Sequence, residues 1–343
     1  MLKTLGAQIK EFKKDSFLTP VFMILEVLME TIIPLMMASI IDNGVEAGDI
    51  HHIYVMGGCM VIVACISLFA GTMGGKYGAR ASAGFARNLR KAMYENIQTF
   101  SFSNIDKFST AGLVTRLTTD VTNLQNAYQM LLRMCVRAPI SLICAMIMAF
   151  FINARLASVY LIAVIVLGMI LAIITVRAHH YFMEVFPKYD YLNASVQENV
   201  SAIRVVKAYV REDYEKKKFT QASKNIYNMF VKAEGVLAFN SPVMQIAVYS
   251  CIIALSWLGA KMIVAGSLTT GELMSLLTYC MNIMMSLMML SMVFVMLAMS
   301  IASAERICEV LNEKSDITNP ENPVYEVADG SVTFDHVTFR YNK

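Results

Sequence analysis

Apolar residues occur along this chain in long uninterrupted runs, separated by shorter polar loops and two long mixed segments. Six runs are long enough to cross a hydrocarbon core of about 30 Å, which takes about 20 helical residues. The runs lack the alternating pattern of barrel strands, and backbone groups in lipid must be satisfied internally, so we predict an all-α membrane protein. The predicted spans are 17–41, 53–77, 131–152, 157–177, 241–264 and 272–300.

The basic residues are unevenly distributed between these spans. Segments 1–16, 78–130, 178–240 and 301–343 hold 23 of the 29 lysines and arginines, whereas the three short loops at the opposite span ends hold one. Lys and Arg favour the cytoplasmic side, so we predict a multi-pass protein of the plasma (inner) membrane with both termini in the cytoplasm. The net charge of +3 then reflects topology, and we expect a lipid bilayer rather than a nucleic acid as partner.

Composition supports the membrane assignment. Apolar residues make up 57% of the 343 and charged residues only 16%, a balance that a soluble domain of this length would struggle to keep in solution. Six of the seven cysteines fall inside the predicted spans and are interpreted as small apolar core residues. The adjacent pairs His51–His52 and His179–His180 do not have the i, i+4 spacing that converges on a metal, and we expect no metal site.

The two long cytoplasmic connections, 78–130 and 178–240, carry helical patterns throughout. A structureless loop of that length is unusual, so each connection is predicted to extend membrane helices inward as a stalk. A single helix over 53–102, for example, would measure about 75 Å at 1.5 Å per residue.

Each stalk needs a reversal at its tip. In the first, cap and turn formers predict a short transverse helix near 104–110, and Gly112 allows another break. In the second, Tyr209 and Val210 lie among charges within 206–219, where the chain must turn back. We interpret the tips as docking sites for a partner, with a merely solvated connection as the alternative.

Two acidic residues lie inside the first span. Glu26 and Glu30 are four residues apart on one helix face, and charges at that depth usually face a cavity or a partner. One hypothesis is that they attract a cationic, amphipathic substrate. The alternative is pairing with Arg133 or Arg137 of the third span, which for their part are candidates for substrate contact or for snorkelling to headgroups.

The sixth span carries a methionine stripe. Met281, Met285, Met288, Met292, Met296 and Met299 recur at helical spacing in a stretch without charges. Methionine is flexible and polarizable, so the stripe favours a polyspecific apolar pocket, to which Tyr279 and Asn282 would add polar contacts. Ordinary helix packing in a methionine-rich protein is the alternative.

Four segments, in order, resemble those of ATP-binding cassette (ABC) exporters. AGLVTRLTTDVTNLQ at 111–125 is similar to the stretch after their first coupling helix, and YLNASVQENVSAIRVVKAYVRED at 191–213 to their second intracellular loop. ASAERICEVLNEKSDI at 302–317 resembles the linker after the sixth helix, and GSVTFDHVTFRYNK at 330–343 the first strands of the nucleotide-binding domain. The departures, at Thr115, Ala202, Tyr209 and Glu305, are mild.

The resemblance implies the six-helix transmembrane fold of type 1 (type IV) exporters, in a bacterial multidrug-type half-transporter. It assigns 1–16 to an elbow helix, 17–310 to the transmembrane domain, 311–329 to a linker and 330–343 to the truncated start of an ATP-binding domain. The implied function is export of hydrophobic or amphipathic compounds (drugs, lipids or peptide-like molecules) by alternating access.

The resemblance also implies partners and site residues. A second half-transporter, identical or different, would pair with this one, and nucleotide-binding domains carrying ATP and Mg would engage the coupling helices. Tyr341 would stack on adenine. The coupling residues it indicates are Ile105, Asp106, Phe108, Tyr209, Arg211 and Glu212.

A phosphate-binding loop of the form G-x-x-x-x-G-K-S/T is absent from these 343 residues. The nearest string, GTMGGKYG at 71–78, has the wrong spacing, and its glycines favour close helix packing instead. We therefore expect no catalytic residue and no ATP hydrolysis from this chain alone. A secondary transporter without an ATPase and a non-transporting membrane scaffold are the rival interpretations.

Overall fold

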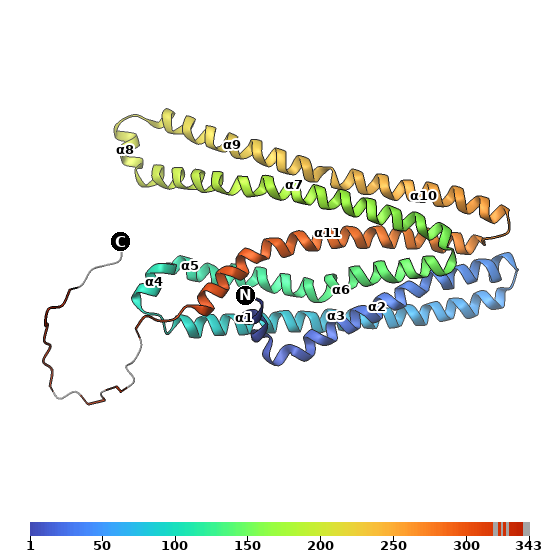
Figure 1. The fold of residues 1–343 in the computed structure, drawn as a ribbon, viewed down its shortest axis with the longest axis horizontal. Coiled ribbons are helices and arrows are strands. Elements are labelled where there is room, and N and C mark those ends of the chain that lie inside the picture. Colours follow the sequence, from blue (N-terminus) through green and yellow to red (C-terminus); the bar gives the residue numbers. More distant parts are fainter. Residues whose placement is uncertain (318–321, 324, 327–328, 339–343) are drawn as a thin grey trace.

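The computed structural model describes residues 1–317, 322–323, 325–326 and 329–338, and the elements in that part of the chain are helical (Figure 1). A 3-10 helix (Ala7–Phe12) follows α1, and π-helical turns lie at Ile40–Glu46 and Arg116–Asp120. The α-helices are α1 (Leu2–Gly6), α2 (Lys13–Ser39), α3 (Ile50–Ile97), α4 (Phe102–Phe108), α5 (Thr110–Thr115), α6 (Val121–Ile152), α7 (Ala154–Ser201), α8 (Ile203–Ala208), α9 (Glu212–Ala238), α10 (Asn240–Val264) and α11 (Thr270–Asn312).

The six predicted spans are confirmed as helices long and apolar enough to cross a membrane. The elbow expected over 1–16 is interrupted, because Lys10 adopts a positive φ of 42° inside the 3-10 helix and kinks it. The strand pattern at 330–343 forms no strand over its described residues, 330–338, since a strand needs a neighbour to pair with. Tyr341 lies outside the described residues.

The stalks are confirmed as continuations of membrane helices. α3 and α7 each run for 48 residues, about 72 Å at 1.5 Å per residue. α7 lies antiparallel to α9 and α10, and this arm diverges from the bundle of α2, α3, α6 and α11 toward its α8 end (Figure 1).

The first stalk tip turns differently from the prediction. The transverse helix is present as α4, but the break after it falls at Ser109, whose φ is 55°, and Gly112 lies inside α5. The Ser109 hydroxyl accepts a hydrogen bond from Gly112 N, which caps the new helix and stabilises the break.

Two cores hold the helices together at opposite ends. The outer core, near the short loops, is formed by α6, α7, α10 and α11 around Tyr160, Leu255 and Ile283. The inner core, near α4, packs Leu89, Phe108 and other side chains against the end of α11. Water drives burial only in the inner core, at about 1.5–3 kcal/mol per large side chain, whereas packing contacts hold helices together in lipid.

Close packing also explains several glycines of α3. A Cβ on Gly74 would lie 2.4 Å from Met23 Cε, and one on Gly71 would lie 3.0 Å from a Glu26 carboxylate oxygen. The small-residue spacing therefore brings α2 against α3, as expected, although Gly75 has open space beside it.

We predict that Gly271→Ala destabilises the protein more than Gly75→Ala. A Cβ at Gly271 would lie 2.5 Å from the carbonyl oxygen and 2.8 Å from the Cα of Ala38, and backbone atoms cannot move aside as a side chain does. Overpacking of this kind costs roughly 1–3 kcal/mol. The midpoint of thermal unfolding in detergent should fall for Gly271→Ala and stay near the wild-type value for Gly75→Ala; equal midpoints would contradict the packing argument.

Candidate functional site

The intramembrane charges form one cluster between α2 and α6. The Arg137 Nη1 donates to Glu26 Oε1 at 2.5 Å, and its Nη2 donates to both carboxylate oxygens of Glu30 at 2.9 and 2.8 Å. The i, i+4 spacing on α2 stacks the two carboxylates on one face, where the guanidinium reaches both. Of the two alternatives from the sequence, pairing of the glutamates is therefore confirmed, and Arg137 is their partner.

A cavity of about 340 Å³ lies beside this cluster, among α2, α6 and α11. Most of the lining residues come from one face of α6, where they follow one another at alternating intervals of three residues and one residue. α2 and α11 add one methionine each. The lining residues are Met23, Asn126, Gln129, Met130, Arg133, Met134, Arg137 and Met289.

Sequence reasoning found the two arginines of this lining but missed the other six residues. The signal was present, since polar and methionine residues recur every three or four positions along 126–137. It lay partly before the predicted start of the third span, in a stretch that we had assigned to the stalk.

The methionine stripe of α11 lies apart from the cavity lining. Met281, Met285, Met288 and Met292 are exposed, and Met296 is half-buried. The side chain of Met299 is outside the described residues. Whether this stripe contacts substrate stays a prediction, because its exposed face has no neighbour among the described residues that would define a pocket.

The two polar residues assigned to that pocket are placed differently. Tyr279 is fully buried in the outer core, and its hydroxyl donates to the Thr31 carbonyl at 2.6 Å. It therefore packs α11 against α2 and does not line the cavity. Asn282 is half-buried, and its carbonyl accepts from the Ser286 hydroxyl within the same helix.

Hydrogen bonds close the outer ends of α2 and α11. The Ser275 hydroxyl donates to the Pro34 carbonyl at 2.6 Å, three residues along α2 from the Thr31 carbonyl that accepts from Tyr279. At the loops, Asp42 accepts from the Thr269 hydroxyl at 2.7 Å and from Gly271 N at 2.8 Å. These bonds join α2 to α11 on the outer side, and the cavity lies on the inner side of them.

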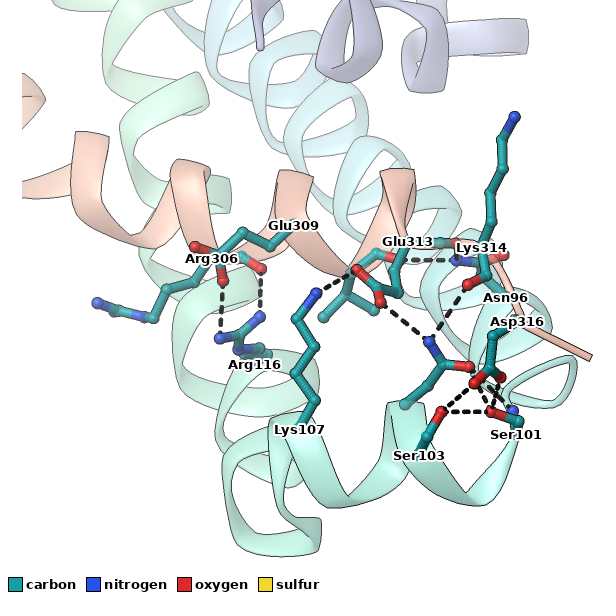
Figure 2. A network of polar contacts seen from close by, with 12 residues as sticks. Asn96, Ser101, Ser103, Lys107, Arg116, Arg306, Glu309, Glu313, Lys314 and Asp316 are labelled. Carbon is teal, nitrogen blue, oxygen red and sulfur yellow. Dashed lines mark hydrogen bonds and ion pairs between the residues drawn. The ribbon is translucent and has the colours of Figure 1, made fainter. Parts of the chain in front are cut away.

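At the first stalk tip, a polar network fastens α4 to the end of α11 (Figure 2). We call it the tip clamp, and it joins Asn96, Ser101, Ser103, Asn104 and Lys107 to Glu313, Lys314 and Asp316. Asn104 donates to Glu313 Oε1 at 2.9 Å, while Lys107 Nζ donates to Glu313 Oε2 at 2.8 Å. The Asp316 carboxylate accepts from the Ser101 and Ser103 hydroxyls.

Two ion pairs extend this connection along α11 toward the membrane. Arg116 pairs with Glu309 at 2.9 Å, as Figure 2 shows. Asp120, which is almost fully buried, accepts from Arg306 Nε and from the Ser303 hydroxyl, both at 2.8 Å. The last two turns of α11 are thus tied to the first stalk at several levels.

The coupling residues predicted at this tip have unequal exposure. Asp106 is exposed and Ile105 half-buried, but Phe108 is buried in the inner core, where its ring stacks on Phe100 with centroids 5.8 Å apart. Phe108 therefore anchors the tip instead of presenting a docking surface. The exposed aromatic ring is that of Phe102, at 87%, which sequence reasoning missed together with the tip clamp.

The second tip is confirmed as a sharp reversal. Val210 has a φ of 51°, and Tyr209 and Val210 are 75% and 80% exposed. Arg211 lies over the ring of Tyr214 at 5.9 Å, and Glu212 pairs with Lys207 at 3.1 Å. α8 lies away from α4 and from the end of α11 (Figure 1), so these side chains face outward without a clamp.

Comparison with known proteins shows what this arrangement is similar to. Residues 16–288 match the family model of the ABC transporter transmembrane region. An uncharacterized ABC transporter ATP-binding protein of Bacillus subtilis, YfiB, is 31% identical over 321 residues, which cover 94% of this chain and 56% of that protein.

Two mycobacterial relatives agree with this match. The Mycobacterium tuberculosis protein Rv1273c, also named as an ABC transporter ATP-binding protein, is 31% identical over 99% of this chain and 59% of its own length. A fatty acid ABC transporter ATP-binding/permease protein of Mycobacterium bovis is 25% identical over 74% of this chain and 40% of its own length. The chain thus spans 56 to 59% of its first two relatives.

We predict that Arg137→Gln destabilises the protein by roughly 1–3 kcal/mol, between the values for exposed and for buried ion pairs, because the partly buried Glu26 and Glu30 lose their shared partner. Adding Glu26→Gln and Glu30→Gln to this variant should restore most of the stability. Thermal unfolding in lipid nanodiscs measures both effects, with Arg155→Gln, at an exposed position in the first turn of α7, as control. A single variant as stable as the control would argue against the cluster.

The tip clamp should weaken in acid. The hydrogen bond from Lys107 lowers the pKa of Glu313, and those from Ser101 and Ser103 lower the pKa of Asp316. A carboxyl group with a lowered pKa in the folded state contributes stability above its unfolded-state pKa and loses it as the pH falls through the folded value. We therefore expect the clamp to hold at neutral pH and to loosen below about pH 4.

A nitroxide label on Lys314, whose side chain is exposed, reports this change as increased mobility in acid. Asp316→Asn is the matched variant: it should raise the mobility at neutral pH and reduce the further change in acid. Equal label mobility in Asp316→Asn and in the wild type at neutral pH would show that the Asp316 carboxylate does not hold the clamp.

Proposed function

This chain belongs to the family of ABC transporter transmembrane regions, and from that premise we propose that it is the membrane half of an ATP-driven exporter of hydrophobic or amphipathic compounds. The name of one relative, a fatty acid transporter, supports amphipathic substrates. The relatives' names include ATP binding, so we assign ATP and magnesium to an ATP-binding domain that works with this chain. We place both stalk tips in the cytoplasm.

The observation that carries this proposal is the continuity of α11. α11 contributes Met289 to the cavity and runs without interruption to Asn312, directly before Glu313 of the tip clamp. Met289 and Glu313 are 24 residues apart, about 36 Å along the helix axis. A rigid helix transmits displacement over such a distance, whereas a flexible connection would absorb it. The site where a compound binds is therefore mechanically linked to the end where an ATP-binding domain would pull.

In this mechanism the tips divide the work. The first tip is fastened to the segment that follows α11 in the same chain, so it would move with the ATP-binding domain of that chain. The second tip, with exposed Tyr209 and Val210, would dock on the ATP-binding domain of a second half-transporter. Closure of the two domains would then draw the stalks together and open the cavity outward.

Opening outward has a structural cost that ATP must offset. The contacts of Asp42 with Thr269 and Gly271 and the hydroxyl contacts near Pro34 close the outer side, so some of them must break in the outward form. ATP shifts this equilibrium only if it binds the outward form more tightly than the inward one. This chain would supply the binding cavity, the contacts between α2 and α11 that close its outer side, and the long helix α11 that transmits the movement. ATP hydrolysis would supply the free energy.

The test uses the full-length protein, reconstituted in inside-out vesicles with an amphipathic fluorescent dye. We expect dye uptake that requires both ATP and Mg, and Tyr209→Ala should lower it by about tenfold, as loss of an interface hot spot does. Tyr227→Ala is the matched control, since Tyr227 is also exposed but lies on the shaft of α9, away from the tip.

Uptake that proceeds without ATP would support a secondary transporter instead. No uptake of any dye, together with ATP hydrolysis that no amphiphile stimulates, would exclude the exporter function. Equal loss in the two tyrosine variants would show that the second tip has no special part in coupling.

A further inference from the structure

The charges that line the cavity are both positive. Among the described residues, the charged side chains in its wall are Arg133 and Arg137, and both glutamates of the cluster bond to Arg137 outside that lining. Arg133 has no ion pair or hydrogen bond with any described residue, and its Nε is buried without a partner. We propose that Arg133 anchors a binding subsite for the anionic headgroup of a single-chain amphiphile.

Arg133 as a whole is half-buried, and burying its Nε–H without a partner is costly, because that donor loses water and gains no hydrogen bond in return. The Arg133 side chain packs closely against Gly78 of α3. A Cβ added to Gly78 would lie 3.3 Å from Arg133 Cδ and 3.4 Å from Arg133 Cγ. A carboxylate or phosphate oxygen that accepts a hydrogen bond from the guanidinium group of Arg133 would neutralise its charge.

Two neighbouring amides extend the donor set. Asn126 and Gln129 precede Arg133 by seven and four residues on the same face of α6, and both line the cavity. Neither side chain has a hydrogen-bond partner among the described residues, so both have donors to spare. Three unengaged donor groups on one helix face suit an anion with several acceptor oxygens.

The depth of Arg133 fits a headgroup. It lies 19 residues from Ile152, the outer end of α6, or about 28 Å along the helix, which is close to the inner edge of a hydrocarbon core of about 30 Å. Headgroups of the inner leaflet lie at this level. Met23, Met130, Met134 and Met289 then offer the apolar surface that an alkyl chain needs.

The volume of the cavity limits the size of the ligand. At about 340 Å³ it is near the lower end of the range for small-molecule sites, about 300–1,000 Å³, which favours one alkyl chain over several. The headgroup could be a carboxylate, as in a fatty acid, or a phosphate, as in a lysophospholipid. The shared chemistry is an anion on a single chain.

The sequence suggested the opposite charge, a cationic substrate drawn by Glu26 and Glu30. The structure argues against that hypothesis, because both carboxylates already share Arg137 as a partner and neither glutamate belongs to the cavity lining. The second oxygen of Glu26, Oε2, is buried without a partner outside that lining. The remaining alternative is that Arg133 serves only as a distant counter-ion to this cluster, whose three groups sum to a net charge of −1. In that case its loss would weaken all ligands alike.

The experiment measures binding of radiolabelled oleate to the full-length protein in nanodiscs of zwitterionic lipid, above the pKa of the ligand's carboxyl group. Unlabelled oleate, methyl oleate, oleylamine and oleoyl lysophosphatidate compete for the site. We expect oleate to bind at least about tenfold more tightly than its methyl ester, the size of effect expected for a charge-assisted hydrogen bond. Arg133→Gln should abolish this preference and leave methyl oleate binding unchanged.

Two variants sharpen the result. Arg133→Lys, which keeps the charge but not the guanidinium geometry, should retain part of the preference. Arg155→Gln, at an exposed position in the first turn of α7, should retain all of it. If lysophosphatidate competes more strongly than oleate, the natural headgroup is a phosphate; the reverse order indicates a carboxylate, and either order supports the subsite.

Three outcomes would overturn the subsite: equal affinity of oleate and methyl oleate in the wild type, equal weakening of both by Arg133→Gln, or a preference for oleylamine. The subsite proposal rests on the proposed function, but different experimental results would refute each of the two proposals. ATP-dependent transport of neutral or cationic amphiphiles without an oleate preference would refute the subsite alone. An Arg133-dependent oleate preference without ATP-dependent transport would refute the exporter alone.

Discussion

The bilayer core offers no water to a backbone N–H or C=O group, and this constraint shapes the whole molecule. It makes every span a continuous helix, and a helix that is already formed continues beyond the membrane at no further nucleation cost. The stalks follow from the same rule, since α3 and α7 leave the membrane without a break. Where polar groups do occur at membrane depth, a partner is supplied from another helix, as Arg137 does for Glu26 and Glu30.

The same constraint makes the exceptions informative. The hydroxyls of Ser275 and Tyr279 donate to the carbonyls of Pro34 and Thr31, which joins α2 to α11 near the point where the proline interrupts the backbone hydrogen bonds of α2. Arg133 is different, because no described residue satisfies its buried Nε. The ends of α2 and α11 near the short loops are thus joined, a residue of the cavity lining has an unsatisfied donor, and the opposite end of α11 is clamped to the first stalk tip.

Much of the fold follows from local sequence. The number and approximate limits of the six spans depend on apolar length, which is a property of each segment alone. The stalks were predictable because loops of 53 and 63 residues with helical patterns have few other solutions, and the reversal at Tyr209 and Val210 was marked by its charges. The break at Ser109 was less predictable, since a non-glycine residue there adopts a positive φ that Gly112 had seemed better suited to provide.

Relations between segments were beyond the sequence alone. Arg133 and Arg137 lie one turn apart on α6 and were equivalent candidates as partners of Glu26 and Glu30, but the way α6 packs against α2 brings only Arg137 within reach. Packing likewise buries Phe108 and exposes Phe102 on one short helix. Apolar length and helical period are encoded locally, so the sequence determined the spans and their faces; the rotation and crossing of helices decide which faces meet, and only the tertiary structure determined those.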